Sequence, residues 1–196
     1  MQRKDVDARG IALRGISFGG LLAPRAAAFD KRIAALIADP GSTSTWLDFP
    51  EIVRNTADSG DAATTNQLWR EMIIPGATPE QLFAMKKNLE VFSPEAHDQV
   101  KAGGYPTDWA ALSAEIQKYD LTGVAEKITC PTLVTQYEGD TAFGDEPDAL
   151  YAMLRTKKKD LVRFTAVDGA QYHCGPMAPQ VSNEACWDWL DEVFER

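Results

Sequence analysis

The sequence predicts an α/β fold in which helices cover a parallel sheet. Short, continuously apolar segments alternate with segments of helical periodicity, which is the pattern of strands joined by right-handed helical crossovers. Glycine and proline separate a strand-turn-helix opening, a long helical middle and a closing β-α-β-α stretch. The composition, 44% hydrophobic and 25% charged, is that of an ordinary globular protein.

The core elements follow from the apolar runs and the helical patterns after them. Apolar runs that suit buried strands occupy residues 11–15, 33–38, 131–137 and 161–167. Helical patterns occupy residues 21–29, 147–157 and 181–194. Pro131 stands at the first position of its strand, where a missing N–H is tolerated.

A helical insertion separates the second and third strands. Between Pro40 and about Asp120, amphipathic segments at helical spacing cover residues 46–54, 66–73, 79–91 and 107–118. This connection of roughly eighty residues is longer than one returning helix requires, and such connections often form lids over a site. We therefore divide the chain into a first part of the core (1–39), a helical lid (40–120) and the rest of the core (121–196). The alternative is that the insertion supplies only extra packing helices.

The segment Gly15-Ile16-Ser17-Phe18-Gly19 matches G-x-S-x-G directly after a predicted strand and before an Ala-rich helix. In this setting a serine occupies a strained turn that only small neighbours permit, and its Oγ is presented to solvent. We predict that Ser17 is a nucleophile and that Gly15, Gly19 and Gly20 make room for the turn. The N–H groups at the start of the helix point at the reacting centre, so the N–H of Phe18 is the candidate oxyanion donor.

A serine hydroxyl needs a base at neutral pH, and the chain has two histidines. His173 follows the last predicted strand, in a loop at the carboxyl end of the sheet, where open parallel sheets place their sites. His97 lies in the insertion, within Ser93-Pro94-Glu95-Ala96-His97-Asp98, where a solvated face explains it. We predict that His173 is the base; a structural loop histidine is the alternative.

An imidazole base needs an acid on its other nitrogen to set the tautomer and stabilise the imidazolium. Asp140, in the loop after the strand ending at Tyr137, reaches the same sheet edge as His173 and is the predicted acid. Asp39, directly after the preceding strand, is the main alternative. Three further acids fit less well, one being too close to a strand end and two standing at a helix N-terminus: Glu138, Asp145 and Asp148.

With the order Ser17, Asp140, His173, the chain resembles the α/β-hydrolase superfamily. Two segments are similar to the 2,6-dihydroxypseudooxynicotine hydrolase group and to fungal polyketide-shortening hydrolases. These groups have acyl-peptidase and esterase relatives. The segments are Gly15-Ile16-Ser17-Phe18-Gly19-Gly20 with Ala23-Pro24-Arg25-Ala26-Ala27, and Gly169-Ala170-Gln171-Tyr172-His173-Cys174 with Met177-Ala178-Pro179. The resemblance implies nucleophile Ser17, acid Asp140, base His173 and an oxyanion donor at Phe18. It also implies cleavage of a carbon–carbon bond beside a ketone, or of an ester or amide, without a cofactor.

One departure from that family is large. Its members have several strands before the turn that carries the nucleophile, and the loop after one of those strands supplies the second oxyanion N–H. In this sequence only about ten residues precede the first strand. We therefore expect the carboxyl-terminal half of an α/β-hydrolase fold, with reduced catalysis by this chain alone. The strand at residues 11–15 would have a bare edge, which predicts self-association into a homo-oligomer. The alternative function is a catalytically impaired domain that acts as a binding or oligomerisation module.

Charge and residue usage restrict the expected partners. Lys+Arg 20 against Asp+Glu 29 gives a net charge of −9 and a sequence pI near 4.7, which argue against a nucleic-acid surface. No segment has the pattern of a membrane helix or a signal peptide, so we expect a soluble, cytoplasmic protein that acts on a small molecule. Three cysteines without a C-x-x-C pair, and the lack of nucleotide-binding or metal-ligand motifs, indicate neither a disulfide framework nor a metal site.

Aromatic residues of the insertion are the candidates for an apolar substrate pocket. Large aromatic side chains more often belong to a core, so this is the weaker of the two interpretations. The candidates are Trp46, Trp69, Tyr105 and Trp109.

Overall fold

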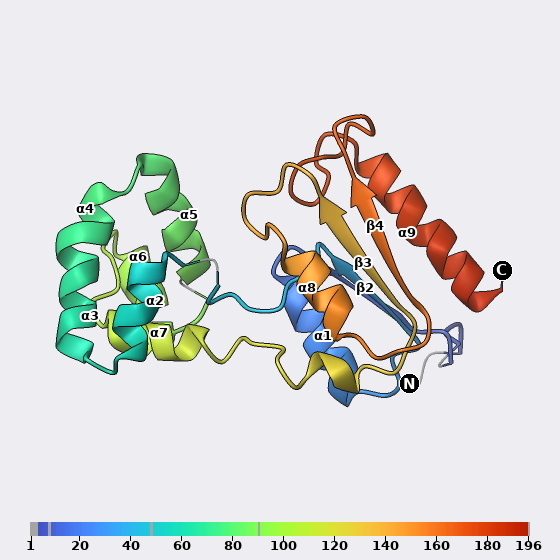
Figure 1. Cartoon of the computed structure of the whole chain (residues 1–196), viewed down its shortest axis with the longest axis horizontal. Helices are drawn as coiled ribbons and strands as arrows, with labels where there is room; N and C mark the ends of the chain where they lie inside the picture. Colours follow the sequence, from blue (N-terminus) through green and yellow to red (C-terminus); the bar gives the residue numbers. More distant parts are fainter. Residues whose placement is uncertain (1–3, 8, 48, 90, 196) are drawn as a thin grey trace. The chain divides into compact units, whose positions relative to one another are not determined.

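In the computed structural model the chain forms two compact units (Figure 1). The sheet unit comprises residues Met1–Ser44 and Asp120–Arg196, and the helical unit comprises residues Thr45–Tyr119. The structure describes residues 4–7, 9–47, 49–89 and 91–195. Each unit has its own hydrophobic core.

The sheet unit is built on a four-stranded parallel sheet in the order β1-β2-β3-β4. The strands are Ala12–Ile16, Ala35–Asp39, Thr132–Tyr137 and Lys159–Phe164. Figure 1 shows α9 (Pro179–Phe194) on one face of the sheet, and α1 (Gly19–Phe29) with α8 (Glu146–Met153) on the other. A short 3₁₀-helix, η2 (Ala125–Lys127), precedes β3. The predicted fold class, a parallel sheet flanked by helices, is confirmed.

Strand β2 lies between β1 and β3, which explains why it is buried at every position. Ile37 of β2 and Leu133 of β3 pack with Cys186 and Trp189 of α9 in one core cluster. Burial of each large aliphatic side chain is worth about 1.5–3 kcal/mol relative to exposure. The Trp189 Nε1–H also donates to the Asp160 carboxylate at 2.7 Å, which ties α9 to β4.

Two elements end earlier than the apolar pattern predicts. The fourth strand stops at Phe164, because the Asp168 carboxylate accepts hydrogen bonds from the N–H and Oγ1 of Thr165, both at 2.8 Å, and turns the chain. Helix α8 was expected to reach residue 157 but ends at Met153. There the Lys159 ammonium donates to two carbonyl groups of the last turn, at 2.8 and 3.0 Å. Both stops depend on residues outside the element itself.

The helical unit consists of short helices around an aromatic and aliphatic core. They are α2 (Glu51–Asp58), α3 (Ala62–Leu68), the π-helix η1 (Trp69–Ile73), α4 (Ile74–Gly76), α5 (Pro79–Leu89), α6 (Pro94–Lys101) and α7 (Trp109–Ile116). The rings of Trp69 and Trp109 stack at 3.9 Å in this core, where Val53, Leu112 and Ile116 are also buried. This packing is what stabilises helices too short to persist alone.

Helix starts in this unit follow side-chain caps. Asp61, Ser93 and Asp108 each accept a hydrogen bond from a backbone N–H three residues on. The first helix, expected from residue 46, begins only at Glu51, because Pro50 before it is extended. Helix α6 was not predicted as a separate helix, although Ser93 followed by proline at the first helical position is a recognisable start signal.

Candidate active site

Ser17 lies in a strained turn between β1 and α1. Its φ is +57°, in the left-handed region that non-glycine residues seldom adopt. The turn is held by a hydrogen bond from the Ser17 N–H to the Asp39 carbonyl at 2.8 Å and by one from the Gly20 N–H to the Ser17 carbonyl at 2.7 Å. The hydroxyl is therefore presented at the carboxyl end of β1, as G-x-S-x-G predicts.

Close approach explains two of the three glycines around Ser17. A Cβ on Gly15 would lie 1.9 Å from the carbonyl oxygen of Gly19, and a Cβ on Gly20 would lie 1.7 Å from that of Pro40. A Cβ on Gly19 would meet nothing within 4 Å. The expectation that Gly19 must be small for packing is therefore wrong, and the tight positions are Gly15 and Gly20.

Helix α1 begins at the nucleophile. Phe18 is its N-cap residue, so the Phe18 N–H belongs to the end of the helix that carries partial positive charge. Pro24 inside this helix has no N–H to donate to the Gly20 carbonyl, which instead accepts from Ser42 N–H at 3.4 Å. The loop after β2 is thus tied to the first turn of the helix.

His173 lies within hydrogen-bond distance of Ser17. Its Nε2 is 2.8 Å from Ser17 Oγ. The loop that carries it, between β4 and α9, turns through Gly169, Cys174 and Gly175, all with positive φ. Cys174 is a non-glycine residue at φ +62°, directly after the histidine. Strain of this kind is concentrated where a loop must present a side chain at one position.

Asp140 contacts the other nitrogen of the same ring. Asp140 Oδ2 is 2.8 Å from His173 Nδ1, and Oδ1 accepts hydrogen bonds from the N–H groups of Ala142 (2.9 Å) and Phe143 (3.2 Å). A carboxylate only accepts, so Nδ1 carries a proton. When the ring is neutral, Nε2 therefore faces Ser17 with its lone pair and can take the serine proton. Burial alone would raise the pKa of Asp140, but its hydrogen bonds with His173 and these N–H groups hold that pKa below its ordinary value.

The same pair raises the pKa of His173 to about 10. The hydrogen bond that His173 Nδ1–H donates to Asp140 is the main cause, the adjoining Cys174 side chain contributes, and partial burial opposes both. The arrangement therefore favours the imidazolium, the form that a general base takes after it accepts the serine proton.

Asp39, the alternative acid, is committed elsewhere. The residue is 1% exposed. Its carboxylate accepts hydrogen bonds from Arg14 Nε (2.9 Å) and Nη2 (2.5 Å), and also from Thr135 Oγ1 (2.6 Å) and Tyr137 OH (2.5 Å). Burial and the Asp39 charge raise the pKa of Tyr137 far above its ordinary value, so this phenol stays a donor. Asp39 supports the turn at Ser17 through its backbone carbonyl, which accepts a hydrogen bond from the Ser17 N–H.

Two of the remaining acidic candidates bind other groups, and the third stands at a helix start. Glu138 Oε2 accepts from the Ala166 N–H at 2.8 Å, and Asp148 forms an ion pair with Arg163. Asp145 is the N-cap residue of α8. His97 lies on α6 in the helical unit, 3.5 Å from Asp98, with a partly exposed side chain.

The four aromatic pocket candidates lie in the core of the helical unit. Trp46, Trp69 and Trp109 are buried there, and Tyr105 packs against them with the Lys86 ammonium 4.2 Å from its ring centroid. These positions favour the core interpretation over substrate binding.

Phe143 is a residue near the site that the sequence does not single out. Its ring lies edge-on to the His173 imidazole at a centroid distance of 5.1 Å, and its N–H donates to Asp140. It therefore contacts both members of the acid–base pair. The only available signal is its place three residues after Asp140, which does not predict the ring contact.

The site residues suit acid–base and nucleophilic chemistry. The described part of the chain holds no group of three or more His, Cys, Asp or Glu side chains placed to ligate a metal ion. Among the described residues, none of the helices combines the length and apolar character that crossing a membrane requires.

Solved structures with the same fold include α/β hydrolases. The chain is similar to the α/β hydrolase GrgF from Penicillium sp. sh18 (TM-score 0.60, 20% identity, 97% of this chain and 66% of that chain). It is also similar to the 2,6-dihydroxy-pseudo-oxynicotine hydrolase (TM-score 0.57, 19% identity, 98% and 42%). A third is acetyl xylan esterase 1 from Thermoanaerobacterium sp. JW/SL YS485 (TM-score 0.54, 16% identity, 99% and 49%).

The likeness concerns the fold. The chain is covered almost completely in each comparison but spans 66%, 42% and 49% of the lengths of those three proteins. No protein-family model and no curated protein matches the sequence. The predicted resemblance to the α/β-hydrolase fold is confirmed by these structures at low sequence identity.

Proposed function

We propose that this chain carries the catalytic machinery of a serine-dependent hydrolase. The observation that supports this proposal is one continuous hydrogen-bonded series, in which His173 lies 2.8 Å from both Ser17 Oγ and Asp140 Oδ2. The fold shared with known hydrolases is consistent with it.

In the proposed reaction Ser17 Oγ attacks a carbonyl carbon and its proton passes to His173 Nε2. Asp140 stabilises the imidazolium that results. The Phe18 N–H is the proposed donor to the oxyanion of the tetrahedral intermediate. His173 then protonates the leaving group, and water, deprotonated by the same histidine, hydrolyses the acyl-enzyme.

We also propose which kinds of bond the site cleaves. One triad supports cleavage of esters, amides and carbon–carbon bonds beside a ketone, because these reactions share the acyl-enzyme and differ in the leaving group. We propose a small-molecule carbonyl substrate, and a lid role for the helical unit. We also propose a cytoplasmic location, since the three cysteines are free thiols.

The test is labelling by a fluorophosphonate, which reacts only with an activated serine. We expect the wild-type chain to be labelled at Ser17 and the Ser17→Ala variant to remain unlabelled. Ser59→Ala, which removes an exposed serine of the helical unit, is the matched control and should label normally. A correctly folded wild-type chain that resists the probe would contradict the proposal. Parallel assays with p-nitrophenyl esters and aryl ketones then identify the bond.

A binding or oligomerisation role is the second candidate, and the edge position of β1 favours it. β1 pairs with β2 on one side, and Ile16 at its end is 55% exposed. An apolar strand edge recruits further strands, so we expect self-association of this chain at micromolar concentration. Size-exclusion chromatography with light scattering measures it, and a monodisperse monomer would contradict this expectation.

A further inference from the structure

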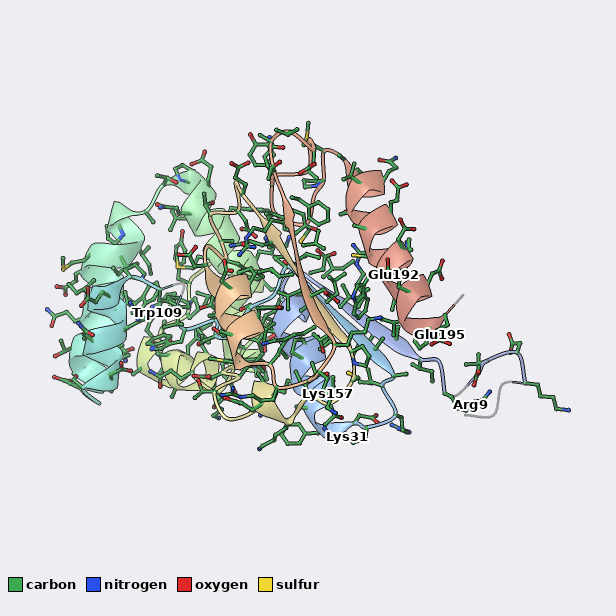
Figure 2. All side chains as sticks on the ribbon, turned by 45° about the vertical axis from the view of Figure 1, so that its right-hand side comes forward. Arg9, Lys31, Trp109, Lys157, Glu192 and Glu195 are labelled. Carbon is green, nitrogen blue, oxygen red and sulfur yellow. The ribbon has the colours of Figure 1, made fainter. Side chains whose placement is uncertain are left out.

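Charge in the sheet unit is divided between the two ends of the sheet. The segments at and after the carboxyl ends of the strands, residues 15–24, 33–44, 128–154 and 164–195, contain no lysine or arginine. Apart from Arg25 within α1, the described lysines and arginines of this unit outside the strand interiors stand in segments that lead into the strands or at a strand's first residue, among them Arg9, Lys31, Arg32, Lys127, Arg155, Lys157, Lys158 and Lys159. Figure 2 shows Lys31 and Lys157 at the end of the sheet where the strands begin.

Two arginines within the strands come nearer to the site, and both are paired. Arg14 of β1 binds Asp39 through two nitrogens, at 2.9 and 2.5 Å. Arg163 of β4 forms its ion pair with Asp148. Arg25, in the middle of α1, donates instead to the Asp120 carbonyl at 3.4 Å. The segments 15–24, 33–44, 128–154 and 164–195 of the sheet unit therefore offer no lysine or arginine to an anion beside Ser17.

Acidic side chains are exposed at that same end. Glu138 follows β3, Asp145 precedes α8 and Asp168 follows β4. Glu138 and Asp168 are fixed there by hydrogen bonds from backbone N–H groups. The hydrogen bonds from Thr165 hold the pKa of Asp168 below its ordinary value, so its carboxylate keeps its charge at neutral pH.

Apolar groups adjoin the histidine at this end. Phe143 packs edge-on to the His173 ring. In the histidine loop, Tyr172 is 51% exposed and Met177 is 75% exposed. The environment next to the nucleophile thus combines apolar surface with negative charge.

We infer that the site accepts neutral or cationic carbonyl compounds and discriminates against substrates that carry a carboxylate or phosphate close to the scissile bond. The inference rests on the proposed hydrolase function and adds the charge class of its substrate. An anionic substrate would approach Glu138, Asp145 and Asp168 without a lysine or arginine from these segments to offset them, and its reaction would add an oxyanion beside these carboxylates.

The test compares three p-nitrophenyl esters of equal chain length: a neutral hexanoate, an adipate half-ester with a terminal carboxylate, and a 6-(trimethylammonio)hexanoate. Rates are corrected with the Ser17→Ala variant. We expect kcat/KM for the anion to be about tenfold below that of the neutral ester at low ionic strength, and the difference to shrink at 1 M NaCl. The cationic ester should react at least as fast as the neutral one.

A triple variant locates the effect. It combines Glu138→Gln, Asp145→Asn and Asp168→Asn, which remove the charges but keep hydrogen-bond acceptors. We expect the ratio of kcat/KM for the neutral ester to kcat/KM for the anionic ester to fall from about tenfold to about threefold or less. The matched control makes the same change in net charge on α9, with Asp188→Asn, Asp191→Asn and Glu192→Gln (Glu192 is labelled in Figure 2). That control should leave the ratio unchanged.

The outcomes separate the two proposals. If none of the esters reacts faster with wild type than with Ser17→Ala, the proposed function fails and the charge preference fails with it. If esters are hydrolysed but the anion reacts as fast as the neutral compound, only the charge preference is overturned. An equal change of the ratio in both triple variants would likewise overturn it, because net charge and not this end of the sheet would then be responsible.

Discussion

The sheet unit and the helical unit bury different kinds of side chain. In the sheet unit, buried polar groups collect at the carboxyl ends of the strands, where Asp39, Thr135 and Asp140 are all buried. In the helical unit, the largest buried groups are tryptophans, leucines and an isoleucine. The side chains of Asp61, Ser93 and Asp108 cap three of its short helices. We therefore expect mutations at the buried polar groups of the sheet unit to change catalysis, and mutations in the core of the helical unit to change stability.

Substitution at the nucleophile should have the largest effect on chemistry and little on folding. We expect Ser17→Ala to lower turnover by about 10⁶-fold, because no other group can form the acyl-enzyme. Its melting temperature should stay close to that of wild type, since the Ser17 backbone bonds are kept. Steady-state kinetics and calorimetry measure the two effects. A variant that retains turnover would remove Ser17 from the proposed mechanism.

Asp140→Asn should have the next largest effect, about 10⁴-fold in kcat, because an amide no longer sets the productive tautomer of His173. It should also lower the pKa of His173 from about 10 toward 6.5, since the Asp140 hydrogen bond is the main cause of the raised value. NMR titration measures this pKa, with His97 in the same molecule as internal reference. An unchanged His173 titration would contradict the pairing.

The same pair makes stability depend on pH in a defined direction. A raised pKa of His173 contributes stability that is fully present below pH 6.5 and is lost as pH rises toward 10. The lowered pKa of Asp140 contributes stability that is present above its unfolded value and is lost as pH falls. Denaturant unfolding at pH 6 and pH 10 should show a larger loss for wild type than for Asp140→Asn. Equal losses would show that the pair does not contribute.

In the helical unit we expect mutations to change stability rather than catalysis. Trp69 is 3% exposed and stacks on Trp109, so Trp69→Ala should destabilise this unit by about 3–5 kcal/mol. Trp187→Ala, which removes an exposed tryptophan near Arg14, is the control and should cost less than about 1 kcal/mol. Urea unfolding followed by circular dichroism distinguishes the two. Similar losses would refute the contrast between the units.

Phe143→Leu should have the smallest effect. Loss of the ring contact to His173 is expected to lower kcat by about 2–10-fold with little change in KM, because aromatic pairs contribute about 0.5–1.5 kcal/mol. The His173 pKa should shift with kcat, a change that a purely structural role would not produce. Phe143→Tyr keeps the ring and should restore both. A KM effect alone would assign Phe143 to substrate contact.

Local patterns in the sequence were sufficient for the fold class and for the proposed nucleophile and base, and they reduced the acid to Asp140 with Asp39 as the main alternative. A continuously apolar run predicts a strand buried on both faces, and G-x-S-x-G between strand and helix predicts the turn at Ser17. Loops at the carboxyl ends of parallel strands converge on one edge, which is why His173 and Asp140 could be placed near Ser17. These inferences need only the periodicity of the backbone and the order of the elements.

Only the tertiary structure decided which acid belongs to which partner. Asp39 ends β2 and Asp140 follows β3, but Arg14 and Tyr137 bind Asp39 from β1 and β3, while Asp140 contacts His173. The need for Gly20 but not Gly19, and the edge-on contact of Phe143, also arise between segments distant in sequence. The sequence by itself determined the strands of the sheet and the residue types at its edge, because those depend on local spacing. Partner choice depends on packing over long separations, which no local pattern encodes.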